Sequence, residues 1–186
     1  MPDDTWIALD FETATPERSS ACSLGIAVIE GGAVTESGGW LIQPPGNAYD
    51  GRNISVHGIT PRMTADAPTF AELYPRLLPY LEGQRIIAHW AAFDVSVLRA
   101  TIGLYRLPMP DTRYACSCRM AQRAFPALRN HQLPTVCGHC DIPLEHHDAV
   151  SDAHAAALVA LHCCRAVGAG GIADAVERLG VSVGRL

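Results

Sequence analysis

Two acids in the segment TWIALDFETAT (residues 5–15), Asp10 and Glu12, are the first residues of this sequence that could do chemistry. The apolar residues around them predict a buried strand, on which side chains two positions apart leave the same face. Two carboxylates side by side repel each other unless a cation lies between them, and oxygen ligands suit Mg²⁺ or Mn²⁺. Because an Asp-x-Glu pair also occurs by chance on exposed strands, the pair alone does not establish a metal site.

Two further acids strengthen the case for a metal site. Asp94 begins a predicted helix after the apolar segment RIIAHWAAF, and Asp152 lies in the first turn of a long alanine-rich helix. Either acid alone is accounted for by the positive end of the helix dipole. Acids at the end of a strand and at the start of two helices, all next to apolar elements, are better explained if they converge on one site.

A run rich in metal-binding side chains, residues 136–154, contains two cysteines and four histidines. Cys137-Gly-His-Cys140 has the form of a redox dithiol or of half a zinc site, whereas His146 and His147 suit a different site. The whole chain has seven cysteines, an odd number, which in a reducing compartment is typical of buried thiols rather than of a disulfide framework.

The elements that must position these residues follow from the pattern of apolar residues. Residues 5–15, 22–30 and 33–44 read as strands, the last two joined by a tight turn at Gly31 and Gly32. After them the pattern alternates between helices and short strands. Helices are expected within 67–83, 93–105, 131–140, 148–171 and 172–180, a strand at 85–90, and a strand leading into a helix within 110–125.

This order predicts an α/β fold, a mixed five-stranded sheet whose strands 1–3 are antiparallel and whose two faces are covered by helices. With 186 residues, of which 48% are hydrophobic, we expect one domain over residues 1–186, with a core at about 5–165 and a terminal helix at 171–180. We expect no membrane span and a cytoplasmic protein, because the chain lacks a long apolar run and its start does not resemble a signal peptide.

Four segments, LDFETAT, HGIT, AHWAAFD and HHDAVSDA, together resemble the motifs of the DEDDh family of 3′-5′ exonucleases, in the family's order and separations. That family includes the proofreading epsilon subunit of bacterial DNA polymerase III and related stand-alone exonucleases, and the similarity spans roughly residues 5–165. The resemblance implies a ribonuclease H-like fold and hydrolysis at the 3′ end of DNA or RNA, which releases nucleoside 5′-monophosphates. It also implies a role in proofreading or DNA repair.

By the same resemblance, Asp10, Glu12, Asp94 and Asp152 match the four metal-site acids, and His147 matches the general base. Two Mg²⁺ (or Mn²⁺) ions held there could clamp the attacking and leaving oxygens of the reaction, with Asp10 the best candidate to bridge them. His146 competes for the role of the base, and the family spacing between the histidine and its acid selects His147.

The resemblance also indicates which residues bind the 3′ end of the nucleic-acid strand. His57, in HGIT, matches a position that contacts the terminal nucleotide, and Thr13 follows the acids where family members approach that nucleotide. Phe11 and Phe93 could wall the pocket for the base, although ordinary packing in the core explains them equally well.

One position departs from the family pattern. The family usually has Asn where this chain has Trp90, in AHWAAFD. An indole there could stack on a base or fill space beside the helix start. His89 next to it is expected to be a structural, hydrogen-bonding histidine.

The net charge of −5 looks wrong for a protein that binds nucleic acid, but four of the acids belong to the predicted metal site. We therefore expect the partner to be a single-stranded 3′ end rather than a long duplex, and the tail GVSVGRL gives no reason to assume association with a polymerase. Two alternatives stay open: an inactive module that binds nucleic-acid ends, and a zinc or thiol-redox protein that uses Cys137 and Cys140.

Overall fold

The structure, a computed structural model that describes residues 4–186, is built on one sheet with the strand order β3-β2-β1-β4-β5-β6. Strands β1 to β3 pair antiparallel, β4 and β5 run parallel to β1, and β6 is antiparallel to β5. The prediction of a mixed sheet with an antiparallel meander is therefore confirmed. The strands are Trp6–Thr13 (β1), Ala21–Glu30 (β2), Ala33–Leu41 (β3), Arg85–Ala88 (β4), Arg113–Cys116 (β5) and Gly184–Arg185 (β6).

The prediction of five strands is wrong, because residues 4–186 contain a sixth, β6, in the tail GVSVGRL, for which no strand was predicted. Its two residues pair with Arg113 and Tyr114 of β5. An ion pair between Arg185 and Asp111 (3.1 Å) lies beside this pairing. Two residues are too few to show an alternating pattern, so only the neighbouring strand reveals this one.

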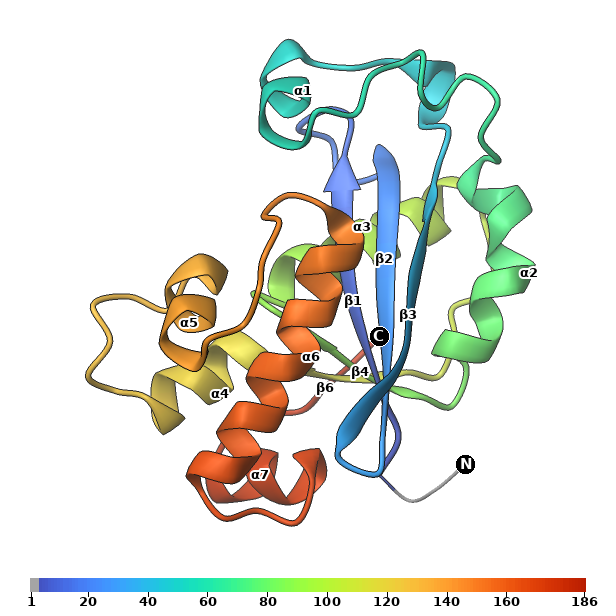
Figure 1. The fold of residues 1–186 in the computed structure, drawn as a ribbon. Helices are drawn as coiled ribbons and strands as arrows, with labels where there is room; N and C mark the ends of the chain where they lie inside the picture. Colours follow the sequence, from blue (N-terminus) through green and yellow to red (C-terminus); the bar gives the residue numbers. More distant parts are fainter. Residues whose placement is uncertain (1–3) are drawn as a thin grey trace.

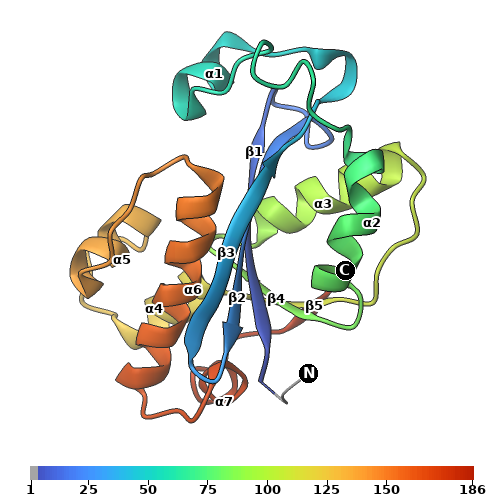
Figure 2. The same cartoon turned by 45° about the vertical axis from the view of Figure 1, so that its right-hand side comes forward.

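Helices cover both faces of the sheet, as expected (Figure 2). On one face lie α4 (Ser117–Ala124), α5 (Leu133–Cys140), α6 (Ala149–Ala166) and α7 (Ile172–Arg178). On the other face lie α2 (Phe70–Leu81) and α3 (Ala92–Leu104). No helix in the described part of the chain is both long enough and apolar enough to span a membrane.

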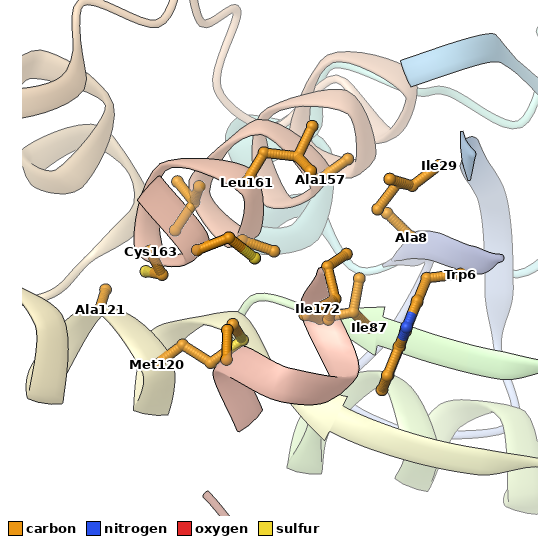
Figure 3. Close-up of a cluster of buried hydrophobic side chains, with 14 of the residues drawn as sticks. Trp6, Ala8, Ile29, Ile87, Met120, Ala121, Ala157, Leu161, Cys163 and Ile172 are labelled. Carbon is orange, nitrogen blue, oxygen red and sulfur yellow. The ribbon is translucent and has the colours of Figure 1, made fainter. Parts of the chain in front are cut away.

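The two faces of β1 carry two separate apolar cores. Trp6 and Ala8 belong to the core under α6, which also contains Ile87 and Met120 (Figure 3). Ile7, Leu9 and Phe11 of β1 belong to the core under α2 and α3. Because side chains alternate along a strand, Asp10 and Glu12 continue the row that faces α6.

The remaining helix, α1 (Gly51–His57), was not predicted. It lies over the end of β1 and β2 (Figure 1). The Asp50 side chain caps its start by accepting a hydrogen bond from the Arg52 N–H (2.7 Å), and Gly58 ends it with φ of 73°. None of its residues is buried, so the sequence lacks the apolar stripe that marks a helix.

Candidate active site

Three carboxylates come together where β1 meets the first turn of α6. Asp10 pairs with Gly25 of β2, and a Cβ on Gly25 would overlap the backbone carbonyl of Ala149. Glycine at this position therefore allows α6 to begin directly against the sheet. As a result, Asp10, Glu12 and Asp152 each offer one carboxylate oxygen, and these oxygens lie within 4.8 Å of one another. Such an arrangement can hold a divalent cation.

The fourth predicted acid, Asp94, reaches the same place from α3. Its side chain is 1% exposed, and one of its oxygens accepts a hydrogen bond from the backbone N–H of Phe11 at 3.0 Å. Asp94 is not among the carboxylates that lie within 4.8 Å of one another, but its charge raises the pKa of both Asp10 and Glu12. The structure thus brings all four predicted acids to one end of β1.

The electrostatics of this cluster fit a cation site. Burial, together with the neighbouring carboxylates, raises the pKa of Asp10 well above its ordinary value and that of Glu12 to about 8. Burial likewise raises the pKa of Asp94 to about 8 and that of Asp152 above its usual range. Acids this close cannot all ionise alone, whereas a bound cation would favour their charged forms. The donor set, carboxylate oxygens only, suits a hard ion such as Mg²⁺ or Mn²⁺.

Both candidate bases lie beside this cluster. His146 Nδ1 is 2.9 Å from Asp152 Oδ2, and His147 Nδ1 is 3.9 Å from Glu12 Oε1. The backbone N–H of His147 donates to Asp152 Oδ2 at 3.0 Å, in a left-handed conformation with φ of 70°. The two imidazole rings stack with their centroids 3.8 Å apart. The choice between them therefore stays a prediction.

A cavity of about 370 Å³ adjoins the acids on the side of α1, and it contains four of the residues predicted to hold the strand end: Phe11, Thr13, His57 and Phe93. His57 Nδ1 accepts a hydrogen bond from the N–H of Ile59 at 3.0 Å, which leaves its Nε2 to donate to the Thr13 carbonyl oxygen at 3.2 Å. Burial lowers the pKa of His57, in agreement with this neutral form.

The two phenylalanines differ in how much they offer this cavity. Phe11 is 2% exposed and packs in the core under α2 and α3, so core packing accounts for most of its side chain. Phe93 is only partly buried, and the guanidinium of Arg18 lies 4.3 Å from its ring centroid. Phe93 is thus the better placed of the two to contact a ligand.

Sequence reasoning missed Asn53 of α1, whose side-chain amide donates to the Thr13 carbonyl at 2.7 Å. Asn53 and His57 are four positions apart, so they lie on the same face of the helix. That spacing becomes informative only if α1 is known to be a helix, and its apolar pattern does not show this.

Trp90 and His89 line a second, larger cavity of about 650 Å³ on the other side of the acids. The indole of Trp90 is 59% exposed, so the interpretation that it fills space is wrong. His89 makes the structural hydrogen bonds expected of it, with Ser117 Oγ at 3.0 Å and the His131 carbonyl at 2.9 Å. Its burial lowers its pKa to about 4.

The cysteine motif does not form a metal or redox site. All seven cysteines are free, and no group of three or more potential metal ligands within residues 4–186 includes a cysteine. Cys137 is 2% exposed in the core under α6, and burial raises its pKa to about 12, which disfavours a reactive thiolate. His139 packs edge-on against Phe125. The motif belongs to a packing helix.

Comparison with known proteins gives a family match over most of the chain. A family model described as exonuclease, of the RNase T type, matches residues 7–160. The epsilon subunit of DNA polymerase III from Escherichia coli (strain K12) is 31% identical over 147 residues, which cover 73% of this chain and 60% of that protein. The PolC-type DNA polymerase III of Oceanobacillus iheyensis is 31% identical over 167 residues, 82% of this chain and 11% of that protein. The chain thus spans only part of these relatives.

Solved structures with low sequence identity share the fold. Exonuclease X in complex with 5′ overhanging duplex DNA aligns with a TM-score of 0.75 at 19% identity, over 94% of this chain and 99% of that one. The nuclease domain of 3′hExo, a DEDDh family member bound to rAMP, aligns with a TM-score of 0.74 at 16% identity, over 87% and 92% of the two chains. The ribonuclease H-like fold expected from the sequence is confirmed by these similarities.

Proposed function

Because this chain belongs to the exonuclease family whose model matches residues 7–160, we propose that it is a metal-dependent 3′-5′ exonuclease. It hydrolyses the terminal phosphodiester bond of a DNA or RNA strand and releases nucleoside 5′-monophosphates. The observation that carries the proposal is the convergence of Asp10, Glu12 and Asp152, with Asp94 buried next to them. An inactive end-binding module would not need four acids that repel one another at one point.

Asp10, Glu12, Asp94 and Asp152 would hold two Mg²⁺ (or Mn²⁺) ions, which would supply the positive charge that activates a water and stabilises the leaving oxygen. Asp152 has a second task. It accepts the His147 N–H at 3.0 Å and so fixes the backbone that carries this imidazole. This hydrogen bond ties the segment that carries the base to the first turn of α6, which carries the metal ligand, so their relative position is set before substrate binds.

His147 is the base in this proposal. Burial and the neighbouring His146 lower its pKa below its usual value of 6.5, so the imidazole is neutral at pH 7 and able to take a proton. His146 already bonds Asp152, and we assign it the task of orienting that carboxylate. In this assignment the two stacked histidines divide the roles of base and support.

The smaller cavity is the proposed place of the terminal nucleotide. His57 and Asn53 both bond the Thr13 carbonyl, and so they tie α1 to the end of β1. Phe93 offers a partly exposed ring to the base, whereas Phe11 mainly supports this wall. A single-stranded 3′ end suits a cavity of about 370 Å³, which has room for one nucleotide rather than for a duplex.

The test uses oligomers of DNA and of RNA, each labelled at the 5′ end, single-stranded or annealed to a partner, with a free or a blocked 3′ end. In Mg²⁺ we expect products that shorten by one nucleotide from the free 3′ end, release of 5′-monophosphates, and no cleavage of blocked strands. Asp10→Asn should abolish release, while Asp174→Asn, which changes an acid on α7, should leave it intact. Tight binding by wild type without any release would instead favour the inactive module.

Association with a polymerase is a separate proposal. Its support is the similarity to polymerase-associated proteins such as the epsilon subunit of Escherichia coli, of which this chain spans 60%. We also propose that residues 1–186 act as one exonuclease domain. Mononucleotide release by this chain alone would establish that the domain is sufficient for the reaction, and co-purification with a polymerase would test the association.

A further inference from the structure

The acids of the proposed active site lie between two cavities rather than at the bottom of one. The smaller cavity, towards α1, and the larger one, towards α4 and α5, share four lining residues, Asp10, Asp152, His146 and His147. A bond cut at these acids would therefore have one nucleotide on each side. The terminal nucleotide is assigned to the smaller cavity, so the larger cavity, of about 650 Å³, has no role yet.

The chemistry of the larger cavity suits a nucleobase better than a phosphate. None of its lining residues in the described chain is an arginine or a lysine, whereas Arg52 lines the smaller cavity. Its neutral polar groups come from Gln122, Asn130 and Gln132, and Leu133 and Pro134 add apolar surface. Amide groups can hydrogen-bond the edge of a base, and apolar surface can cover its face.

Trp90, at the rim of this cavity, has a conformation that stability does not explain. Its φ of 69° is in the left-handed region, which is unfavourable for a residue with a Cβ. Its indole is also one of the most exposed large apolar side chains in the described chain, at 59%. A strained backbone that presents an exposed aromatic ring next to acids is an arrangement found at functional sites.

The surrounding structure holds this strained turn in place. The Trp90 carbonyl accepts the N–H of Phe93 at 2.9 Å, in the turn that leads to Asp94. The Ala91 carbonyl accepts the N–H of Val95 at 2.9 Å, in the same first turn of α3. The position of the indole is thus coupled to the segment that carries one of the four acids.

We propose that the larger cavity binds the second nucleotide from the 3′ end, and that its base stacks on the indole of Trp90. This inference rests on the proposed exonuclease function. The terminal nucleotide lies on the side of α1, where His57 and Asn53 tie the helix to Thr13, and the rest of the strand continues past Trp90. Trp90 is then a substrate-binding residue that stacks on any of the bases without sequence preference, because every base has a face that can stack.

The test is a coupling measurement on single-stranded oligomers, with Ca²⁺ in place of Mg²⁺ so that binding is measured by fluorescence anisotropy without turnover. Base-aromatic stacking of about 1 to 3 kcal/mol predicts that Trp90→Asn raises Kd by about 5- to 150-fold. Trp90→Phe should raise it far less. An abasic second nucleotide should weaken binding to wild type by a similar factor, and should cause little further loss in Trp90→Asn, because both changes remove the same contact.

A matched control separates the effect of the indole from that of the strained backbone. Arg106 is exposed and also has a left-handed backbone, with φ of 52°, at the far end of α3. Asparagine tolerates this conformation, so Trp90→Asn and Arg106→Asn should both melt at or above the wild-type temperature. Only the change at Trp90 should alter Kd.

Several results would overturn the inference. One is a Kd for Trp90→Asn that equals the wild-type value. A second is that the increases in Kd caused by Trp90→Asn and by the abasic second nucleotide multiply when the two changes are combined. A third is that Trp90→Asn is coupled to an abasic terminal nucleotide and not to an abasic second nucleotide. The exonuclease proposal is judged separately, by release of mononucleotides from the wild type in Mg²⁺. Coupling without release would refute only that proposal, and release without coupling would refute only the stacking site.

Discussion

Replacing Glu12 by glutamine should stabilise the metal-free protein, although it removes a proposed metal ligand. Glu12 is 9% exposed, and burial with the charges of Asp152 and Asp94 raises its pKa from 4.5 to about 8. Folded Glu12 therefore keeps its proton up to about pH 8, whereas the unfolded chain releases it above about pH 4.5. The stability associated with this proton is complete below pH 4.5 and is lost as the pH rises towards 8.

The size of the effect follows from this pH range. At pH 7 the unfolded chain has Glu12 ionised, and folding must protonate it. At about 1.4 kcal/mol per pH unit above the unfolded pKa, this protonation lowers the free energy of unfolding by about 3 kcal/mol. Glu12→Gln removes this cost. For a chain of this length, about 3 kcal/mol corresponds to a melting temperature about 6 to 12 °C higher. Asp94, whose pKa is also raised to about 8, should respond to Asp94→Asn in the same direction.

The assay is thermal unfolding in EDTA between pH 5 and pH 8, for wild type, Glu12→Gln and the control Glu177→Gln, which alters an exposed acid on α7. The melting temperature of wild type and of the control should fall towards pH 8, and the advantage of Glu12→Gln should grow with pH. Adding Mg²⁺ should reverse the order, because binding to the folded state stabilises wild type most. If Glu12→Gln gains nothing in EDTA at pH 7 to 8, the four acids do not repel one another as described.

Three further outcomes are expected. His147→Ala should reduce the rate of mononucleotide release by about 10² to 10⁴ and His146→Ala much less, as measured by single-turnover kinetics; the opposite order would make His146 the base. The wild-type rate should rise with pH through a pKa below 6.5, because the base works in its neutral form, and a rate that falls over that range would contradict this assignment. Gly25→Ala should lower both the melting temperature in EDTA and the affinity for Mg²⁺ in calorimetry, because its Cβ meets the Ala149 backbone; unchanged values would show that α6 need not touch β2 there.

The acids of the site could be predicted from the sequence because each occupies a place that local patterns mark. Asp10 and Glu12 end an apolar strand, and Asp94 and Asp152 lie in first helical turns. The motifs around them are specific enough to indicate the exonuclease family, and the family match covers the same region. The same patterns predicted the helices with apolar stripes and the antiparallel meander.

Features without a local pattern could not be predicted. Helix α1 has no buried residue, so no apolar stripe marks it in the sequence, and Asn53 went unnoticed with it. The two residues of β6 become a strand only by pairing with β5. The many potential metal ligands at residues 136–154 suggested one site, but they do not form one. The thiol of Cys137 faces the core, while His146 and His147 face the acids.

The sequence alone therefore determined which acids form the site and to which family the chain belongs, since residue types and their spacing can be read directly from it. The tertiary structure decided what surrounds them. Only packing shows that Gly25 lets α6 reach β1, that Asp152 binds both neighbouring histidines, and that Trp90 stands exposed beside a second cavity. These facts depend on the distances between segments far apart along the chain, which spacing within a segment does not encode.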